Sequence, residues 1–139
     1  MPKILAIDFG EKRTGLAETD DLQIIASGLA GIFTKDLIPF LSKYMKDNSV
    51  QKIIIGLPTR LDGTISIIEN SIQEYIKKIN CLFPSVPIER IDERFTSKIA
   101  AHAISLSGKN KKQRENKHLL DEVSATLILQ TYLDKNIKL

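Results

Sequence analysis

The chain opens with a short apolar run, residues 4–7, that ends in a single carboxylate, Asp8, followed by Phe9 and Gly10. Such a run predicts a buried strand with an acidic side chain at its exit and a tight turn after it. An acid at this place is either an outward-facing turn residue or a group held by a cation, a partner or a metal, because an unpaired buried charge is costly. The strand alone leaves both interpretations open.

The length and composition predict one ordinary globular domain over residues 1–139, large enough to need no disulfide or structural metal. No apolar run approaches the roughly 18 residues of a membrane span, so we expect a cytoplasmic protein with no membrane partner. The single Cys81 excludes an internal disulfide and a cysteine-based zinc cluster, suits a reducing compartment, and is expected in the core. A net charge of +3 is compatible with a nucleic-acid partner without requiring one.

Hydrophobic periodicity predicts a mixed α/β protein. Two strands over residues 13–19 and 23–33 are expected to form an antiparallel meander with the first strand. The continuous apolar strand at residues 52–58 is expected at the centre of the sheet. The remaining expected elements are helices over residues 35–46, 68–79, 96–107 and 117–134 and a strand over residues 88–91. Strands joined through helices run parallel, so the sheet should combine the meander with parallel strands and carry helices on both faces.

Three carboxylates are expected to meet at one edge of this sheet. Asp8 follows the first strand and Glu93 follows the last one, and ligands gather at the carboxyl ends of parallel strands. Asp121 shares a helical stripe with Ala125 and Ile128, and small residues beside it let the last helix press closely on the sheet. Acids forced together repel unless a divalent cation neutralises them, and ligation by oxygen alone favours Mg²⁺ or Mn²⁺ over zinc.

Clustered acids of this kind are typical of phosphodiester hydrolysis, in which two ions roughly 4 Å apart activate a water and stabilise the departing oxygen. The sequence therefore predicts Asp8, Glu93 and Asp121 as catalytic and metal-binding residues. The alternatives are a surface ion pair for Glu93 and an interaction with the helix dipole for Asp121. His118, three residues before Asp121, is more often a solvated helix residue than a group that assists proton transfer.

Cationic side chains suited to phosphate contacts cluster near the end of the chain. The segment over residues 108–117 is rich in lysine and arginine, with Glu115 as its only acid, and is expected to be an exposed, mobile loop. The candidate nucleic-acid-binding residues are Arg13, Arg60, Arg94, Lys109, Lys111, Lys112, Arg114 and Lys117.

Four short blocks follow one another along almost the whole chain. They are Ile7-Asp8-Phe9-Gly10 with Arg13-Thr14-Gly15, Gly56-Leu57-Pro58 with Asp62-Gly63-Thr64, Asp92-Glu93-Arg94 with Thr96-Ser97, and Leu120-Asp121 with Ala125 and Ile128-Leu129-Gln130. Together these blocks resemble the YqgF family, whose members are similar to the RuvC-type Holliday junction resolvases. The resemblance implies a ribonuclease H-like fold, a five-stranded mixed sheet flanked by helices, with metal-binding carboxylates at Asp8, Glu93 and Asp121. Departures at Glu18-Thr19-Asp20, Thr59-Arg60-Leu61 and Ser124-Ala125-Thr126 leave all three acids in place.

The resemblance also implies a nuclease that acts on branched DNA or on the precursor of small-subunit ribosomal RNA. We therefore expect an endonuclease that uses two Mg²⁺ or Mn²⁺ ions on structured nucleic acid, at the 5′ end of pre-16S rRNA or at Holliday junctions. The ribosome is a candidate partner, and both a monomer and a homodimer fit. The alternative is a non-catalytic RNA-binding factor in ribosome assembly that retains the fold. The Asp-x-Gly turn also resembles the phosphate loop of actin-like ATPases and sugar kinases, but 139 residues leave no room for their second domain.

Overall fold

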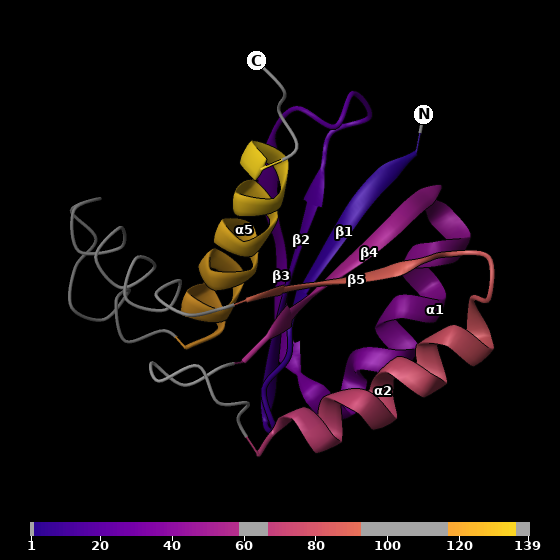
Figure 1. Ribbon diagram of the computed structural model, residues 1–139, viewed down its shortest axis with the longest axis vertical. Helices are drawn as coiled ribbons and strands as arrows, with labels where there is room; N and C mark the ends of the chain where they lie inside the picture. Colours follow the sequence, from indigo (N-terminus) through magenta and orange to yellow (C-terminus); the bar gives the residue numbers. More distant parts are fainter. Residues whose placement is uncertain (1, 59–66, 93–116, 136–139) are drawn as a thin grey trace.

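The computed structural model describes residues 2–58, 67–92 and 117–135, and the structural statements below concern these residues. Within them, five strands form one mixed sheet in the order β3-β2-β1-β4-β5 (Figure 1). The strands are β1 (Lys3–Asp8), β2 (Arg13–Thr19), β3 (Ala26–Phe33), β4 (Val50–Leu57) and β5 (Ile88–Asp92). Strands β1, β2 and β3 pair antiparallel, whereas β4 pairs parallel with both β1 and β5. The predicted meander and the predicted parallel strands are therefore confirmed.

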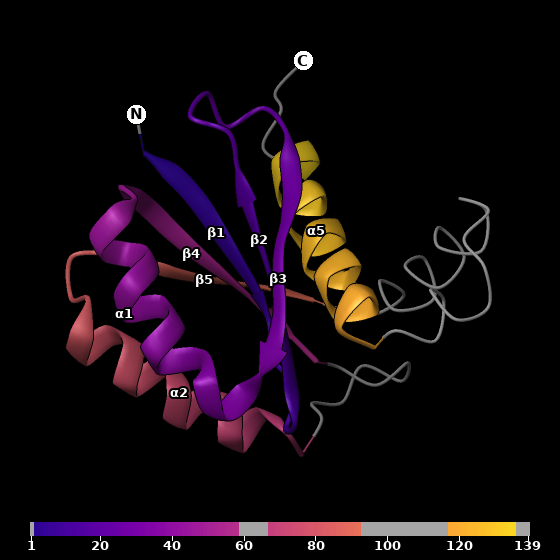
Figure 2. The ribbon, with the colours of Figure 1, turned by 180° about the vertical axis from the view of Figure 1, so that it is seen from behind.

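Helices lie on both faces of the sheet, as expected. They are α1 (Leu37–Asp47), which follows a short 3-10 turn, η1 (Thr34–Asp36), then α2 (Glu69–Leu82) and α5 (Lys117–Lys135). Helices α1 and α2 cover one face and α5 crosses the other (Figures 1 and 2). No helix in the described ranges is long and apolar enough to cross a membrane.

The side chains of β1 alternate between the two faces. Leu5 and Ile7 belong to the apolar cluster under α1 and α2, while Ile4 and Ala6 belong to the cluster under α5. Because successive side chains of a strand point to opposite faces, Asp8 continues the α5 side. Strand β4 lies between β1 and β5 and contributes to both clusters, so it is covered on both faces as predicted, although β1 is the middle strand of the sheet.

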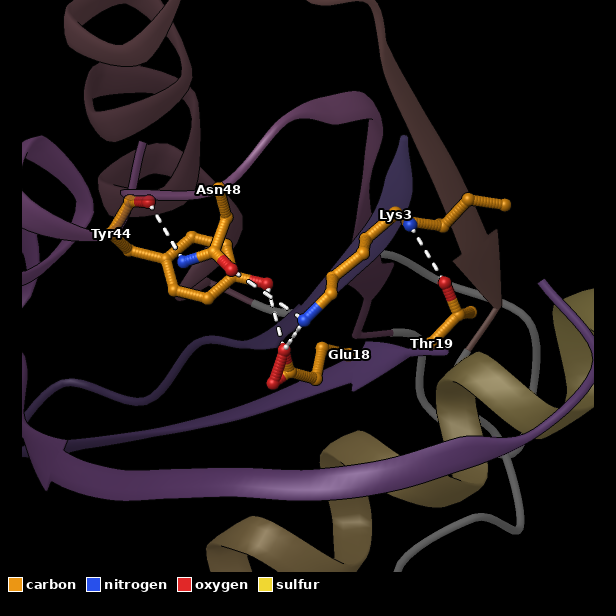
Figure 3. A network of polar contacts seen from close by, with 6 residues as sticks. Lys3, Glu18, Thr19, Tyr44 and Asn48 are labelled. Atoms are coloured by element: carbon orange, nitrogen blue, oxygen red, sulfur yellow. Dashed lines mark hydrogen bonds and ion pairs between the residues drawn. The ribbon is translucent and has the colours of Figure 1, made fainter. Parts of the chain in front are cut away.

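A polar network fixes the other end of β1 (Figure 3). The Lys3 Nζ atom lies 3.0 Å from Glu18 Oε1 and 3.5 Å from Asn48 Oδ1. The Tyr44 hydroxyl donates to the same Glu18 oxygen over 3.1 Å, and burial together with this carboxylate raises the pKa of Tyr44. Glu18, where the sequence departs from the family pattern, thus ties β2 to α1 at the end of β1 opposite Asp8.

Two expectations differ from the structure. Strand β3 begins at Ala26 rather than at residue 23, because Gln23 has a left-handed backbone with φ of 58° and the Asp20 carboxylate accepts hydrogen bonds from the next two amides. Cys81 was expected in the core, but its side chain is exposed on the outer surface of α2, whose buried residues are Ile72 and Ile79. The helix expected at residues 96–107 and most of the expected basic loop lie outside the described residues.

Candidate active site

Asp8 ends β1 at the carboxyl edge of the sheet. Strands β4 and β5 run parallel to β1, and their final residues, Leu57 and Asp92, are partners in the ladder. All three strands therefore end at one edge, which is where ligands commonly bind to open sheets of this kind.

Gly15 brings Asp8 close to the backbone of α5. It is the Cα partner of Asp8 on β2, and paired residues of antiparallel strands lie about 4.5–5.5 Å apart on the same face. On that face a Cβ atom added to Gly15 would overlap the backbone carbonyl group of Asp121. Asp8 and Asp121 thus flank Gly15, and both belong to the edge where β1 ends.

The close approach of α5 depends on small residues on both elements. A Cβ atom on Gly31 of β3 would overlap the backbone of His118, and one on Gly28 would overlap the side chain of Glu122. On the helix, Ser124 and Ala125 are buried against the sheet. Gly15 of β2 and Gly28 and Gly31 of β3 are therefore the positions on which the amino-terminal half of α5 rests.

The turn that follows Asp8 is fixed by Thr34 of η1. The backbone amide of Thr34 donates to the carbonyl of Lys12 over 2.8 Å, and its hydroxyl donates to the carbonyl of Gly10 over 2.5 Å. The same hydroxyl lies 2.8 Å from that of Thr14, and both threonines are buried. The backbone on both sides of the Gly10 turn is thus held by hydrogen bonds.

Arg13 and Asp121 form an ion pair. The Nε atom of Arg13 donates to Oδ2 of Asp121 over 3.1 Å, and the two side chains are 30% and 21% exposed. The sequence predicts Arg13 as a phosphate contact, and in the structure its guanidinium group contacts Asp121, a candidate metal ligand. No local pattern indicates this pair, because 108 residues separate its members.

The other predicted site residues lie at or beyond the limits of the described residues. Lys117 begins α5, but its side chain is not described, and His118 beside it packs edge-on against the ring of Phe33 at 5.2 Å. Outside the described ranges are Glu93, Arg60, Arg94, Lys109, Lys111, Lys112 and Arg114.

The described acids fit a hard divalent cation by the chemistry of their donors. Asp8 and Asp121 offer carboxylate oxygens, the ligands that Mg²⁺ and Mn²⁺ prefer. Within the described part of the chain, however, no three His, Cys, Asp or Glu side chains are grouped so that they could hold a metal ion. A complete protein site at this edge would need a further ligand from the remaining residues.

Arg90 is a residue near this edge that sequence reasoning missed. Its Nη1 and Nη2 atoms donate to the Glu69 carboxylate over 2.6 and 2.7 Å, while Nε and Nη2 donate to the carbonyls of Ile55 and Gly56 over 3.1 and 2.9 Å. One guanidinium group therefore joins β5, the end of β4 and the first turn of α2. Sequence periodicity places Arg90 on a strand and Glu69 on a helix but carries no information on their contact.

Replacing Glu69 by glutamine is expected to lower the free energy of unfolding by about 1–3 kcal/mol at neutral pH, because charge-assisted hydrogen bonds are lost. The bonds from Arg90 hold the pKa of the Glu69 carboxyl below its ordinary value of 4.5. A lowered folded-state pKa stabilises the protein above the unfolded-state value, and this stabilisation is lost as the pH falls through the folded-state value. Urea unfolding should therefore show the two proteins converging below pH 4.5.

The matched control is Glu74→Gln, because Glu74 lies on the same helix with an exposed side chain. Its effect should stay within about 0.5 kcal/mol at every pH. A loss in Glu69→Gln that does not shrink on acidification would contradict the assignment to the charged pair.

The topology of the sheet and the acids at its carboxyl edge define the class as a ribonuclease H-like α/β fold. Two solved structures share this fold. The fowlpox virus resolvase in complex with Holliday junction DNA has a TM-score of 0.60 at 14% identity, over 98% of this chain and 99% of that chain. RuvC of Thermus thermophilus in complex with a Holliday junction substrate has a TM-score of 0.56 at 13% identity, over 98% and 97%. The predicted fold class is confirmed.

The chain belongs to the RuvX family, whose model is described as "Holliday junction resolvase" and matches residues 2–135. A relative from Christiangramia forsetii, named "Putative pre-16S rRNA nuclease", is 50% identical over 133 residues, which cover 96% of this chain and 98% of the relative. A protein of the same name from Bacteroides fragilis is 45% identical over 134 residues, which cover 96% and 97%. The family resemblance read from the four sequence blocks is thus confirmed, and the predicted enzyme class, a hydrolase of phosphodiester bonds, is that of the family.

Proposed function

We propose that this chain is a divalent-cation-dependent endonuclease that hydrolyses phosphodiester bonds in structured nucleic acid. The observation that carries the proposal is the position of Asp8 and Asp121 on either side of Gly15, at the edge where three parallel strands end. Glu93 follows the last residue of β5 in the sequence and is the proposed third carboxylate.

In this mechanism the carboxylates serve as fixed ligands. Divalent cations, when bound, activate a water and stabilise the charge on the departing oxygen. Asp8 offers its carboxylate from a strand buried on both faces, and Asp121 offers its own from a helix seated on Gly15. Ligands held by rigid elements need little reorganisation during the reaction. The proposed phosphate contacts are Arg13, Arg60, Arg94, Lys109, Lys111, Lys112, Arg114 and Lys117.

The proposed substrate is the precursor of 16S ribosomal RNA, cleaved at its 5′ end. Relatives that carry the name of a pre-16S rRNA nuclease share 45–50% of their residues with this chain over almost their whole length. The structures with Holliday junction DNA share the fold at only 13–14% identity. Branched DNA, which the family description names, is the second proposed substrate class.

Cleavage of a pre-16S rRNA fragment and of a four-way DNA junction should be compared with Mg²⁺, with Mn²⁺ and with EDTA. We expect cleavage of the RNA with either cation and none with EDTA. Cleavage in excess EDTA would contradict the cation requirement, and exclusive cleavage of the junction would assign the site to branched DNA.

The Arg13–Asp121 ion pair favours a second candidate function, a non-catalytic RNA-binding factor in ribosome assembly. The guanidinium group of Arg13 neutralises the Asp121 carboxylate without a metal ion. The fold is therefore compatible with acids that have only a structural role. Complementation of a strain that lacks the protein separates the two functions. Full rescue by Asp8→Asn would support the binding factor, and failure to rescue would support the nuclease.

A further inference from the structure

We propose that Arg13 is a positioning residue that competes with the divalent cation for the carboxylate of Asp121. The inference rests on the proposed cation site at Asp8 and Asp121. It assigns to Arg13 a role that precedes any contact with phosphate.

A hydrogen-bonded ion pair joins the two side chains. Within the described residues, Nε of Arg13 donates to Oδ2 of Asp121 over 3.1 Å. A cation that binds this carboxylate therefore meets a positive charge already attached to it. Because like charges repel, a divalent cation on this carboxylate is expected to weaken the Arg13 bond.

The backbones that carry the pair cannot separate easily. Arg13 is held in β2 opposite Phe33, and Gly15, two residues further along, touches the backbone of Asp121. Only rotation of the side chains can open the pair, and the partial exposure of both leaves room for it. When it is displaced, the guanidinium group stays at the edge of the site, where a phosphate group could take the place of Asp121 as its partner.

The pair also has a consequence for the protein without cation. Acids that converge at one edge repel one another, and a neighbouring arginine offsets that repulsion. Arg13 is thus expected to stabilise the cation-free protein and to lower its affinity for the cation. These opposite effects distinguish competition from a purely structural role and from a pure phosphate contact.

The affinity of the full chain for Mn²⁺, measured by titration calorimetry without nucleic acid, tests the competition. Arg13→Gln is expected to bind Mn²⁺ about twofold to fivefold more tightly than wild type, the range for loss of a partly exposed ion pair. The matched control is Lys12→Gln, which removes an equal charge from the adjacent, exposed position and should change the affinity less than about twofold. If Arg13→Gln does not fold, Arg13→Lys takes its place, with a smaller gain expected.

A double-mutant cycle in EDTA provides a readout that needs no cation. Arg13→Gln should lower the midpoint of urea unfolding in the wild-type background and have little effect in the Asp121→Asn background. Equal destabilisation by Arg13→Gln in both backgrounds would contradict an interaction between the two side chains. Unchanged or weaker Mn²⁺ binding by Arg13→Gln would contradict the competition.

The outcomes also separate this inference from the proposed function. Tighter Mn²⁺ binding by Arg13→Gln, in a wild-type protein that cleaves no nucleic acid, would support the competition and contradict the nuclease. Absence of Mn²⁺ binding by both proteins, with the coupling to Asp121 intact, would overturn the cation site and the competition together and leave Arg13 as a structural partner of Asp121.

Discussion

Replacing Asp8 by asparagine is expected to lower the rate of nucleic-acid cleavage by about 10²-fold or more, the effect of losing one preorganised electrostatic group. The amide has nearly the shape of the carboxylate but no charge, so cation binding should weaken. Asp8 lies at the end of β1 rather than inside an apolar cluster, and the free energy of unfolding should change by less than about 1 kcal/mol. Single-turnover cleavage with Mg²⁺ and urea unfolding measure the two effects.

Asp47→Asn is the matched control for this experiment. Asp47 ends α1 on the opposite face of the sheet, with an exposed side chain, so the same chemical change there should leave cleavage unaltered. Cleavage at the wild-type rate by Asp8→Asn, from a preparation free of contaminating nuclease, would remove Asp8 from the site. Loss of cleavage together with unfolding would assign it a structural role.

Much of the fold could be predicted because hydrophobic periodicity reports which side of each element is buried. Strand β2 begins and ends where the sequence predicts, and β4 is an interior strand because its apolar run packs on both faces. The predicted start of β3 was wrong because the Asp20 carboxylate accepts hydrogen bonds from backbone amides of the turn. Such bonds compete with the strand locally, and apolar alternation does not report them.

The edge that carries Asp8 could likewise be predicted, since the end of a strand and the phase of a helix are local properties. The contacts of Arg13 with Asp121 and of Arg90 with Glu69 could not, because each joins elements whose docking is decided by the whole core. The close packing at Gly15 could not be predicted from the strand alone. Its meaning depends on the helix that lies against it.

Replacing Gly15 by alanine is expected to cost about 1–3 kcal/mol of unfolding free energy, the range for overpacking a close contact. The added methyl group would overlap the backbone carbonyl of Asp121, and a helix backbone cannot rotate away as a side chain can. Helix α5 would have to shift outward and carry Asp121 away from Asp8. A displacement of roughly 1 Å between catalytic groups can cost about 10²-fold in rate, so cleavage should fall well beyond the loss of folded protein.

Gly28→Ala separates this effect from a general intolerance of side chains under α5. Gly28 lies on β3 beneath the same helix, but an added Cβ there would meet the flexible side chain of Glu122, which can turn aside. Its cost should be smaller than that of Gly15→Ala, with cleavage retained. If the two alanine variants lost equal stability and equal activity, the contact at Gly15 would not be what places Asp121 beside Asp8. If Gly15→Ala alone lost cation affinity while still folded, the result would show that the packing of α5 on this glycine determines cation binding at the sheet edge.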